Sequence, residues 1–227
     1  MSRPRIACFH GGGSNSTIFS IQSAQLSELL SEFEFVFFDG PFERGPGPGV
    51  LPAFRNDGPF RSWFTTDPSG HEVSDGSGFG DGEEDGIERI YRLMDTKGPG
   101  GEWVGVMGFS QGTRPAGGVL LDVQRGNKKS GPRTGRNIRF GIMCMGGGIP
   151  MESENQASTT ARITLPTLHV HGLKDMFLPL GQHQLATYYD STSANLYEID
   201  YHHAMPWVRS EVEHFAELIR KLYRETR

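Results

Sequence analysis

Apolar runs alternate along the chain with amphipathic stretches, a pattern typical of parallel strands joined by covering helices. Several runs are almost continuously apolar, as expected for strands that are covered on both faces. Strands are predicted at residues 5–9, 33–38, 103–109, 138–145, 167–171 and 195–199. Helices are predicted over 16–31, 83–96, from about 111, and over 210–224, where Ser210 and Glu213 have capping-box spacing. We therefore predict a single α/β domain over residues 1–227, with a mostly parallel six-stranded sheet and helices on both faces.

Residues 39–85 interrupt this alternation. The segment is rich in Gly, Pro and Asp, yet it carries several aromatic residues, whose burial can offset the entropy lost when the segment is ordered. A long segment without periodicity inside a compact domain is typically functional. We predict that it forms a lid or a pocket wall, with simple packing on the surface as the alternative. The residues expected to contact substrate are Phe42, Phe60, Trp63, Phe64 and, beyond this segment, Met145.

Composition and charge exclude several classes of protein. The net charge of −5 argues against nucleic acid as the main partner. No stretch approaches the ~20 apolar residues that a membrane-spanning helix needs, and residues 6–9 are too few for a signal peptide. Cys8 and Cys144 both fall in strand-like runs, where buried thiols are expected rather than a disulfide. These features predict a cytoplasmic protein without a membrane partner.

A G-x-S-x-G motif spans residues 108–112, with Ser110 at its centre. With 31 glycines in 227 residues the bare pattern is weak evidence. Its position is more informative, because it directly follows an apolar strand and precedes a helix. A serine at such a bend projects above the carboxyl edge of the sheet, where it can act as a nucleophile. The alternative is a serine in an ordinary strand-to-helix turn.

A serine hydroxyl needs a base, and the base needs a carboxylate to orient it. On a scaffold of this kind the acid and then the histidine follow the serine along the chain. Asp175 is the preferred acid because it lies in the loop after a strand; Asp190 and Asp200 are the rivals. His202 and His203 follow the last strand, and either could reach Ser110.

Two backbone N–H groups are needed where negative charge develops on the substrate oxygen. One is expected from Gln111, directly after the serine. The other is expected from Gly12 in the loop after the first strand, since glycine lets the backbone approach the substrate closely. His169 and His171 have spacing that could bind zinc, but no Cys or Glu cluster completes a site, so we expect no metal and no cofactor.

Five segments together carry a family likeness. They are HGGGSN at 10–15 with Ile18-Phe19, FDGP at 38–41, GFSQG at 108–112, HGLKD at 171–175 and HAMP at 203–206. The chain resembles the fungal serine hydrolase family of small α/β-hydrolases, over nearly its whole length. The resemblance is closest to the branch found with polyketide synthases. It implies a triad of Ser110, Asp175 and His203, since the family's G-G-H-x-x-P places the histidine three before the proline. This chain has Tyr201-His202 where the family has two glycines.

By this resemblance the protein is expected to hydrolyse an acyl ester or thioester through an acyl-serine intermediate. The acyl group would be a polyketide, released from an acyl carrier protein. Cyclisation, condensation or acyl transfer at the same site is one alternative, and a non-catalytic binding protein is another. The basic stretch 125–139, which includes Lys128 and Lys129, is interpreted either as a solvated loop or as a dock for an acidic carrier protein.

Overall fold

The computed structural model describes residues 2–65, 86–126, 136–151 and 162–227. Its central sheet has six parallel strands in the order β2-β1-β5-β6-β7-β8. The strands are β1 (Arg5–Phe9), β2 (Glu34–Phe38), β5 (Trp103–Phe109), β6 (Arg136–Cys144), β7 (Thr167–Gly172) and β8 (Ala194–Ile199). The six predicted strands are therefore confirmed, with small differences at their ends.

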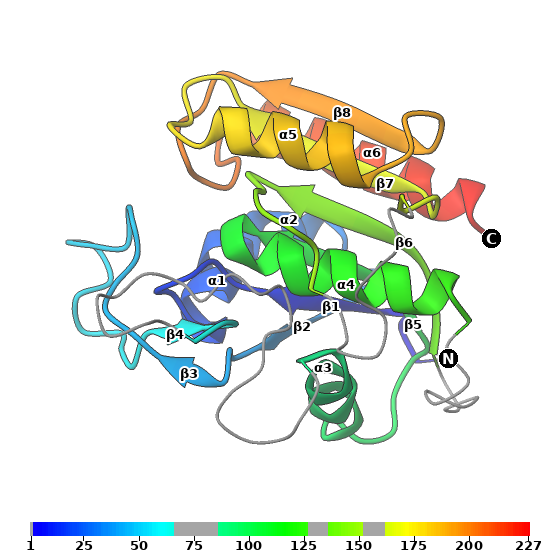
Figure 1. The fold of residues 1–227 in the computed structure, drawn as a ribbon, viewed down its shortest axis with the longest axis horizontal. Helices are drawn as coiled ribbons and strands as arrows, with labels where there is room; N and C mark the ends of the chain where they lie inside the picture. Colours follow the sequence, from blue (N-terminus) through cyan, green and yellow to red (C-terminus); the bar gives the residue numbers. More distant parts are fainter. Residues whose placement is uncertain (1, 66–85, 127–135, 152–161) are drawn as a thin grey trace.

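Helices cover both faces of the sheet, as predicted (Figure 1). On one face lie α1 (Ser16–Gln22), α2 (Ala24–Leu29) and α6 (Arg209–Glu225). On the other lie α3 (Gly86–Asp95), α4 (Thr113–Gln124) and α5 (Leu178–Tyr188). Each layer buries its own apolar cluster against the sheet, so the strands are enclosed on both sides. Among the described residues, no helix combines the length and the apolar character that crossing a lipid bilayer requires.

Three local predictions differ from the structure. The helix predicted over 16–31 is divided at Ser23, whose backbone leaves the helical region. The capping box at Ser210 is wrong, because α6 begins at Arg209, whose guanidinium pairs with Glu213 at 2.7 Å. A short antiparallel hairpin, β3 (Phe42–Glu43) with β4 (Arg61–Ser62), was not predicted from the sequence.

The two cysteines are buried in the sheet as free thiols, as predicted. Cys8 lies in β1 and Cys144 in β6, and both belong to the same apolar cluster. Burial raises the pKa of both thiols well above the ordinary value, because an anion is disfavoured in an apolar core. These thiols therefore contribute packing rather than reactivity.

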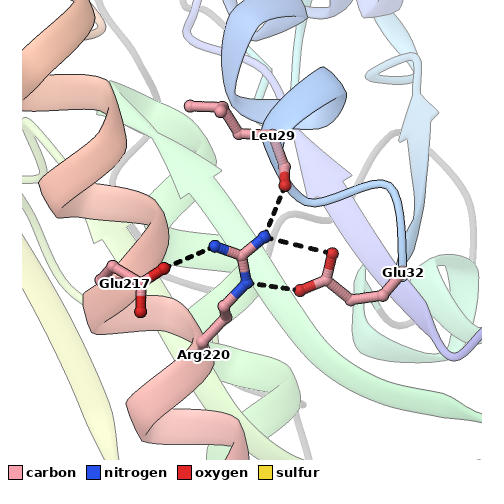
Figure 2. A network of polar contacts seen from close by, with 4 residues as sticks. All are labelled: Leu29, Glu32, Glu217 and Arg220. Carbon is pink, nitrogen blue, oxygen red and sulfur yellow. Dashed lines mark hydrogen bonds and ion pairs between the residues drawn. The ribbon is translucent and has the colours of Figure 1, made fainter.

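A charged network joins α6 to the end of α2 (Figure 2). The guanidinium of Arg220 donates to a carboxylate oxygen of Glu32, to Glu217 and to the carbonyl of Leu29, each at 2.6 Å. The hydrogen bond with Glu32 raises the pKa of Arg220. The carbonyl of Leu29 is at the end of α2, where helical carbonyls lack an intrahelical donor. Arg220 thus provides one missing donor and fixes the spacing of two helices.

Replacing Arg220 by Met is expected to lower the free energy of unfolding by about 1 kcal/mol, since the network is only partly screened by solvent. Urea denaturation measures this loss. Arg209→Met is the matched control, because its single exposed pair with Glu213 is expected to contribute less than about 0.5 kcal/mol. Equal losses in the two variants would show that the network adds nothing beyond one surface ion pair.

Candidate active site

Ser110 occupies a sharp bend between β5 and α4. Its φ of 53° lies in the left-handed region, which a residue with a side chain adopts only at a cost in strain. A Cβ on Gly108 would lie 2.2 Å from the carbonyl oxygen of Gly112, and a Cβ on Gly112 would lie 2.0 Å from that of Phe9. Only glycine fits at both positions, so the bend holds the serine hydroxyl above the carboxyl edge of the sheet.

Asp175 and His203 meet at the same edge, although 28 residues separate them. Asp175 follows β7, and its Oδ2 accepts a hydrogen bond from Nδ1 of His203 at 2.7 Å. Its Oδ1 accepts the N–H of Phe177 at 2.8 Å, which fixes the plane of the carboxylate. The side chains of Asp175 and His203 are only 3% and 12% exposed, so solvent screens the contact weakly. With Nδ1 as donor, Nε2 of His203 carries no proton in the neutral ring and can accept one.

Aromatic rings hold the imidazole of His203 in place. The ring of Phe109 lies 5.1 Å from it and the ring of Phe177 lies 4.9 Å from it, centroid to centroid. His203 and Ser110 line the same two cavities. The arrangement thus places an imidazole, oriented by a carboxylate, in a wall that it shares with Ser110.

The rival residues are engaged elsewhere. His202 is exposed, and its Nδ1 is hydrogen-bonded to the carbonyl of Lys174 at 3.0 Å. Asp200 forms an exposed ion pair with Lys174 at 2.6 Å. Asp190 accepts hydrogen bonds from the backbone and side chain of Thr192, just before β8 begins, at the opposite end of the strands. Of the alternatives from the sequence, only Asp175 and His203 contact each other.

The glycine loop after β1 lies beside Ser110. The N–H of Gly13 is used, because it donates to the carbonyl of Arg61 at 2.8 Å. Within the described residues the N–H of Gly12 has no such acceptor, and Gly12 lines the first cavity with Ser110 and Gln111. The side chain of Gln111 is held beside Gly12: its Oε1 accepts the N–H of Trp63 at 3.0 Å, and its Nε2 lies 3.2 Å from the position that a Cβ on Gly12 would occupy. Its backbone N–H stays the expected second donor.

His10 fixes the start of this glycine loop. Its Nδ1 donates to the carbonyl of Gly11 at 2.8 Å, and its Nε2 accepts the N–H of Gly40 at 2.9 Å. The indole N–H of Trp63 donates to the carbonyl of His10 at 2.8 Å. Burial lowers the pKa of His10 from 6.5 to about 4, and a second proton would also displace the Gly40 N–H. His10 is therefore a neutral structural link, not a catalytic group.

Two cavities meet at Ser110. The first, of about 330 Å³, is walled partly by Arg44, Pro48 and Val50, so the segment predicted as a lid or pocket wall does border the site. The second, of about 300 Å³, is walled by Met145, Phe177 and Leu180 together with the stem of Arg114. Met145 has a φ of 49°, the second strained residue at this edge.

Met145 lines the second cavity, as predicted for a substrate contact, but the four aromatic residues predicted to contact substrate line neither cavity. Trp63 and Phe64 are 1% exposed and belong to the core cluster. The ring of Phe64 packs under the guanidinium of Arg114 at 3.6 Å, and that of Phe42 under Arg89 at 5.4 Å. Phe60 is half-buried directly before β4. The structure thus gives the rings of Phe42, Trp63 and Phe64 packing roles.

Parts of two other predictions fall outside the described residues. These are residues 66–85 of the lid segment, and residues 127–135 of the basic stretch, which include Lys128 and Lys129. At the described end of that stretch, Arg136 pairs with Asp95 and Arg139 donates to the carbonyl of Thr226. These two arginines therefore contact the protein itself.

Sequence reasoning missed Arg44, which lines the first cavity. The sequence feature that could have indicated its position is the alternation of Gly and Pro at residues 45–49, which is typical of a loop that packs closely against another backbone. A Cβ on Gly47 would lie 2.1 Å from the carbonyl oxygen of Gly12, so the two glycine-rich loops pack backbone against backbone. The N–H of Gly47 donates to the carbonyl of Gly13 at 2.9 Å. This contact brings Arg44 beside Gly12.

The family model described as serine hydrolase (FSH1) matches residues 1–215. The chain belongs to this serine hydrolase family. It is 36% identical to a probable esterase, azaC, of Aspergillus niger, over 98% of this chain and 86% of that protein. It is 33% identical to the esterase dbaE of Emericella nidulans, over 98% and 91% of the two chains. The protein is a serine ester hydrolase.

Solved structures support the fold. Acyl-protein thioesterase 2 of Zea mays superposes with a TM-score of 0.62 at 20% identity, over 98% of this chain and 95% of that one. A carboxylesterase of Bacillus cereus superposes with a TM-score of 0.58 at 15% identity, over 97% and 89% of the two chains. The fold of this serine hydrolase is thus the α/β-hydrolase fold that was predicted.

Replacing His203 by Ala is expected to lower kcat/KM for a p-nitrophenyl ester at least ~10³-fold, because the base is lost. His202→Ala is the matched control and is expected to keep at least a tenth of the activity. The reverse ranking of the two variants would exchange their roles. Circular dichroism checks that both variants are folded.

The stability of the protein is expected to fall as the pH drops from 6.5 toward 4. In this window the unfolded chain takes up a proton at His10, whose pKa in the folded protein is about 4, so acid favours unfolding. The loss from this residue is about 2 kcal/mol between pH 8 and pH 5. Denaturant titrations at both pH values measure it. His10→Gln is expected to show a smaller loss over the same interval; an unchanged loss would exclude His10 as the source.

Proposed function

We propose that this enzyme hydrolyses an acyl thioester or ester through an acyl intermediate on Ser110, and that it releases a polyketide acyl group from a carrier protein. The observation that carries the proposal is the hydrogen bond of 2.7 Å between Asp175 and His203, in a wall shared with the strained Ser110. A serine hydroxyl is a poor nucleophile unless such a base removes its proton.

In the acylation step, Oγ of Ser110 attacks the substrate carbonyl while Nε2 of His203 takes the hydroxyl proton. The carboxylate of Asp175 stabilises the imidazolium and keeps the ring in line. The N–H groups of Gly12 and Gln111 donate to the oxyanion, and losing one such donor typically costs ~3 kcal/mol of transition-state stabilisation. The tetrahedral intermediate then expels the thiol or alcohol, which takes the proton from His203.

In the deacylation step, water replaces the leaving group. His203 removes a proton from water and the hydroxide attacks the acyl carbon. The intermediate then collapses, and His203 returns the same proton to Oγ of Ser110 as the acyl bond to Oγ breaks. The products are a carboxylic acid and the restored serine. No cofactor takes part in this scheme.

The two cavities support a substrate with two distinct halves. The second cavity offers Met145, Phe177 and Leu180, which suit an apolar acyl chain. The first offers Gly12, Arg44 and Gln111, which suit a more polar group. Both open at Ser110, where the scissile carbonyl must lie. The polyketide part of the proposal rests on the sequence resemblance, and the combined cavity volume is large enough for a drug-sized acyl group.

Intact-mass spectrometry with acyl chains loaded on a carrier protein tests this function. The wild-type enzyme is expected to gain the mass of the acyl group transiently and to return the carrier as a free thiol. Ser110→Ala is expected to gain no mass and to leave the carrier loaded, because the hydroxyl that forms the acyl bond is absent.

A second part of the experiment supplies the same acyl chains as simple p-nitrophenyl or ethyl esters, without a carrier protein. Turnover of these esters with no turnover of any loaded carrier would reject the carrier as substrate while leaving the esterase chemistry in place. An acyl mass retained by Ser110→Ala would remove Ser110 from the reaction.

A further inference from the structure

Arg44 projects into the first cavity next to the glycine loop. Its Nη1 lies 3.0 Å from the position that a Cβ on Gly12 would occupy. Its backbone is fixed, because the N–H of Arg44 donates to the carbonyl of Phe60 at 3.0 Å. The guanidinium therefore lies in the same cavity as Ser110 and His203, beside the proposed oxyanion donor.

The part of the chain that the structure describes gives this cation no counter-charge. Within the described residues Arg44 forms no ion pair and no side-chain hydrogen bond, whereas Arg61 on the facing strand of the hairpin pairs with Glu43 at 3.4 Å. No aspartate or glutamate of the described residues lines either cavity. Each cavity has an arginine in its lining, so an anionic ligand in either one would lie near a cation.

The position of the guanidinium limits where the anion can lie on the substrate. Nη1 of Arg44 lies 3.0 Å from the Cβ position of Gly12, and a hydrogen bond adds only about 3 Å at each donor. An anionic oxygen bound by Nη1 and a carbonyl oxygen bound by the N–H of Gly12, both in the first cavity, therefore lie within a few covalent bonds of each other. The phosphate of a long prosthetic arm is much farther from its thioester than this. Arg44 therefore selects a group close to the reacting carbonyl.

We infer that Arg44 is a specificity-determining residue that binds an anionic oxygen, a carboxylate or an ionised enol, carried by the substrate within a few bonds of the scissile carbonyl. Guanidinium and carboxylate geometries match in a two-point hydrogen bond, which fixes orientation as well as affinity. With the anion held by Arg44, the apolar remainder of the substrate enters the second cavity. The inference rests on the proposed function, since it assigns the substrate of the same site.

Matched pairs of small substrates test this assignment. One pair carries the charge on the acyl side: a monoester of succinic acid, and the same ester with the free carboxylate converted to a neutral N-methylamide. The other carries it on the leaving-group side: an acyl thioester of mercaptoacetate and that of mercaptoacetamide. The readout is the ratio of kcat/KM for the charged member to that for the neutral member. The wild-type enzyme is expected to favour the charged member of at least one pair by about tenfold.

Arg44→Gln is expected to bring this ratio close to one, and Arg44→Lys to keep part of it, because a point charge replaces the planar fork. Arg55→Gln is the control: Arg55 is an exposed arginine of the same segment that lines neither cavity, and its loss is expected to leave the ratio at the wild-type value. Raising the salt concentration is expected to lower the ratio in the wild type but not in Arg44→Gln.

Two results would overturn the inference. One is a ratio that is the same in Arg44→Gln and the wild type. The other is an equal loss of kcat on charged and neutral members, which would make Arg44 a stabiliser of the transition state rather than a recognition residue. Either result leaves the proposed function standing, because that function is tested by turnover of the loaded carrier and by the loss of turnover in Ser110→Ala, and neither readout depends on Arg44.

Discussion

The site depends on a steric constraint at the bend between β5 and α4. Strand, helix and the end of β1 approach so closely there that the Cβ of any other residue at Gly108 or Gly112 would overlap backbone atoms. The close approach holds Ser110 in the left-handed region and gives its hydroxyl a fixed direction. The strain is confined to this bend, and the packing of β5 and α4 on either side of Ser110 maintains it. Hydrogen bonds orient the remaining groups relative to this point.

Strand order explains why distant segments meet at the serine. β1 and β5 are neighbours in the sheet, but the chain leaves β1 toward one edge and leaves β5 toward the other. Their following loops diverge, and in such sheets the ligand binds in the crevice between them. Because all six strands are parallel, the loops after β7 and β8 end at this same edge and bring Asp175 to His203. The parallel sheet thus assembles residues that are far apart in the sequence.

Much of this organisation could be predicted from the sequence because it is periodic or local. The six strands followed from continuous apolar runs, and the bend at Ser110 followed from two glycines at fixed spacing. Asp175 and His203 were named from their positions after strands, and their mutual contact agrees with that choice. The choice between His202 and His203 needed the family pattern, since both follow β8.

The roles of residues 39–65 could not be predicted in the same way, since this segment has no period that separates buried from exposed positions. Trp63 and Phe64 were interpreted as substrate contacts, yet they fill the core beneath α4. The indole N–H of Trp63 instead supports the carbonyl of His10. The position of Arg44 in the site could not be predicted from the sequence. It depends on a backbone hydrogen bond between Gly13 and Gly47, which lie in two loops over thirty residues apart.

That backbone contact has an evolutionary consequence. The loop carrying Arg44 is attached to the β1 loop through main-chain atoms of glycine, so its attachment is indifferent to most neighbouring side chains. Mutations in the loop can therefore alter which substrates the enzyme binds while Ser110, Asp175 and His203 keep their relative positions. Substitutions in the loop that carries Arg44 can therefore change substrate specificity during evolution while the catalytic residues stay the same.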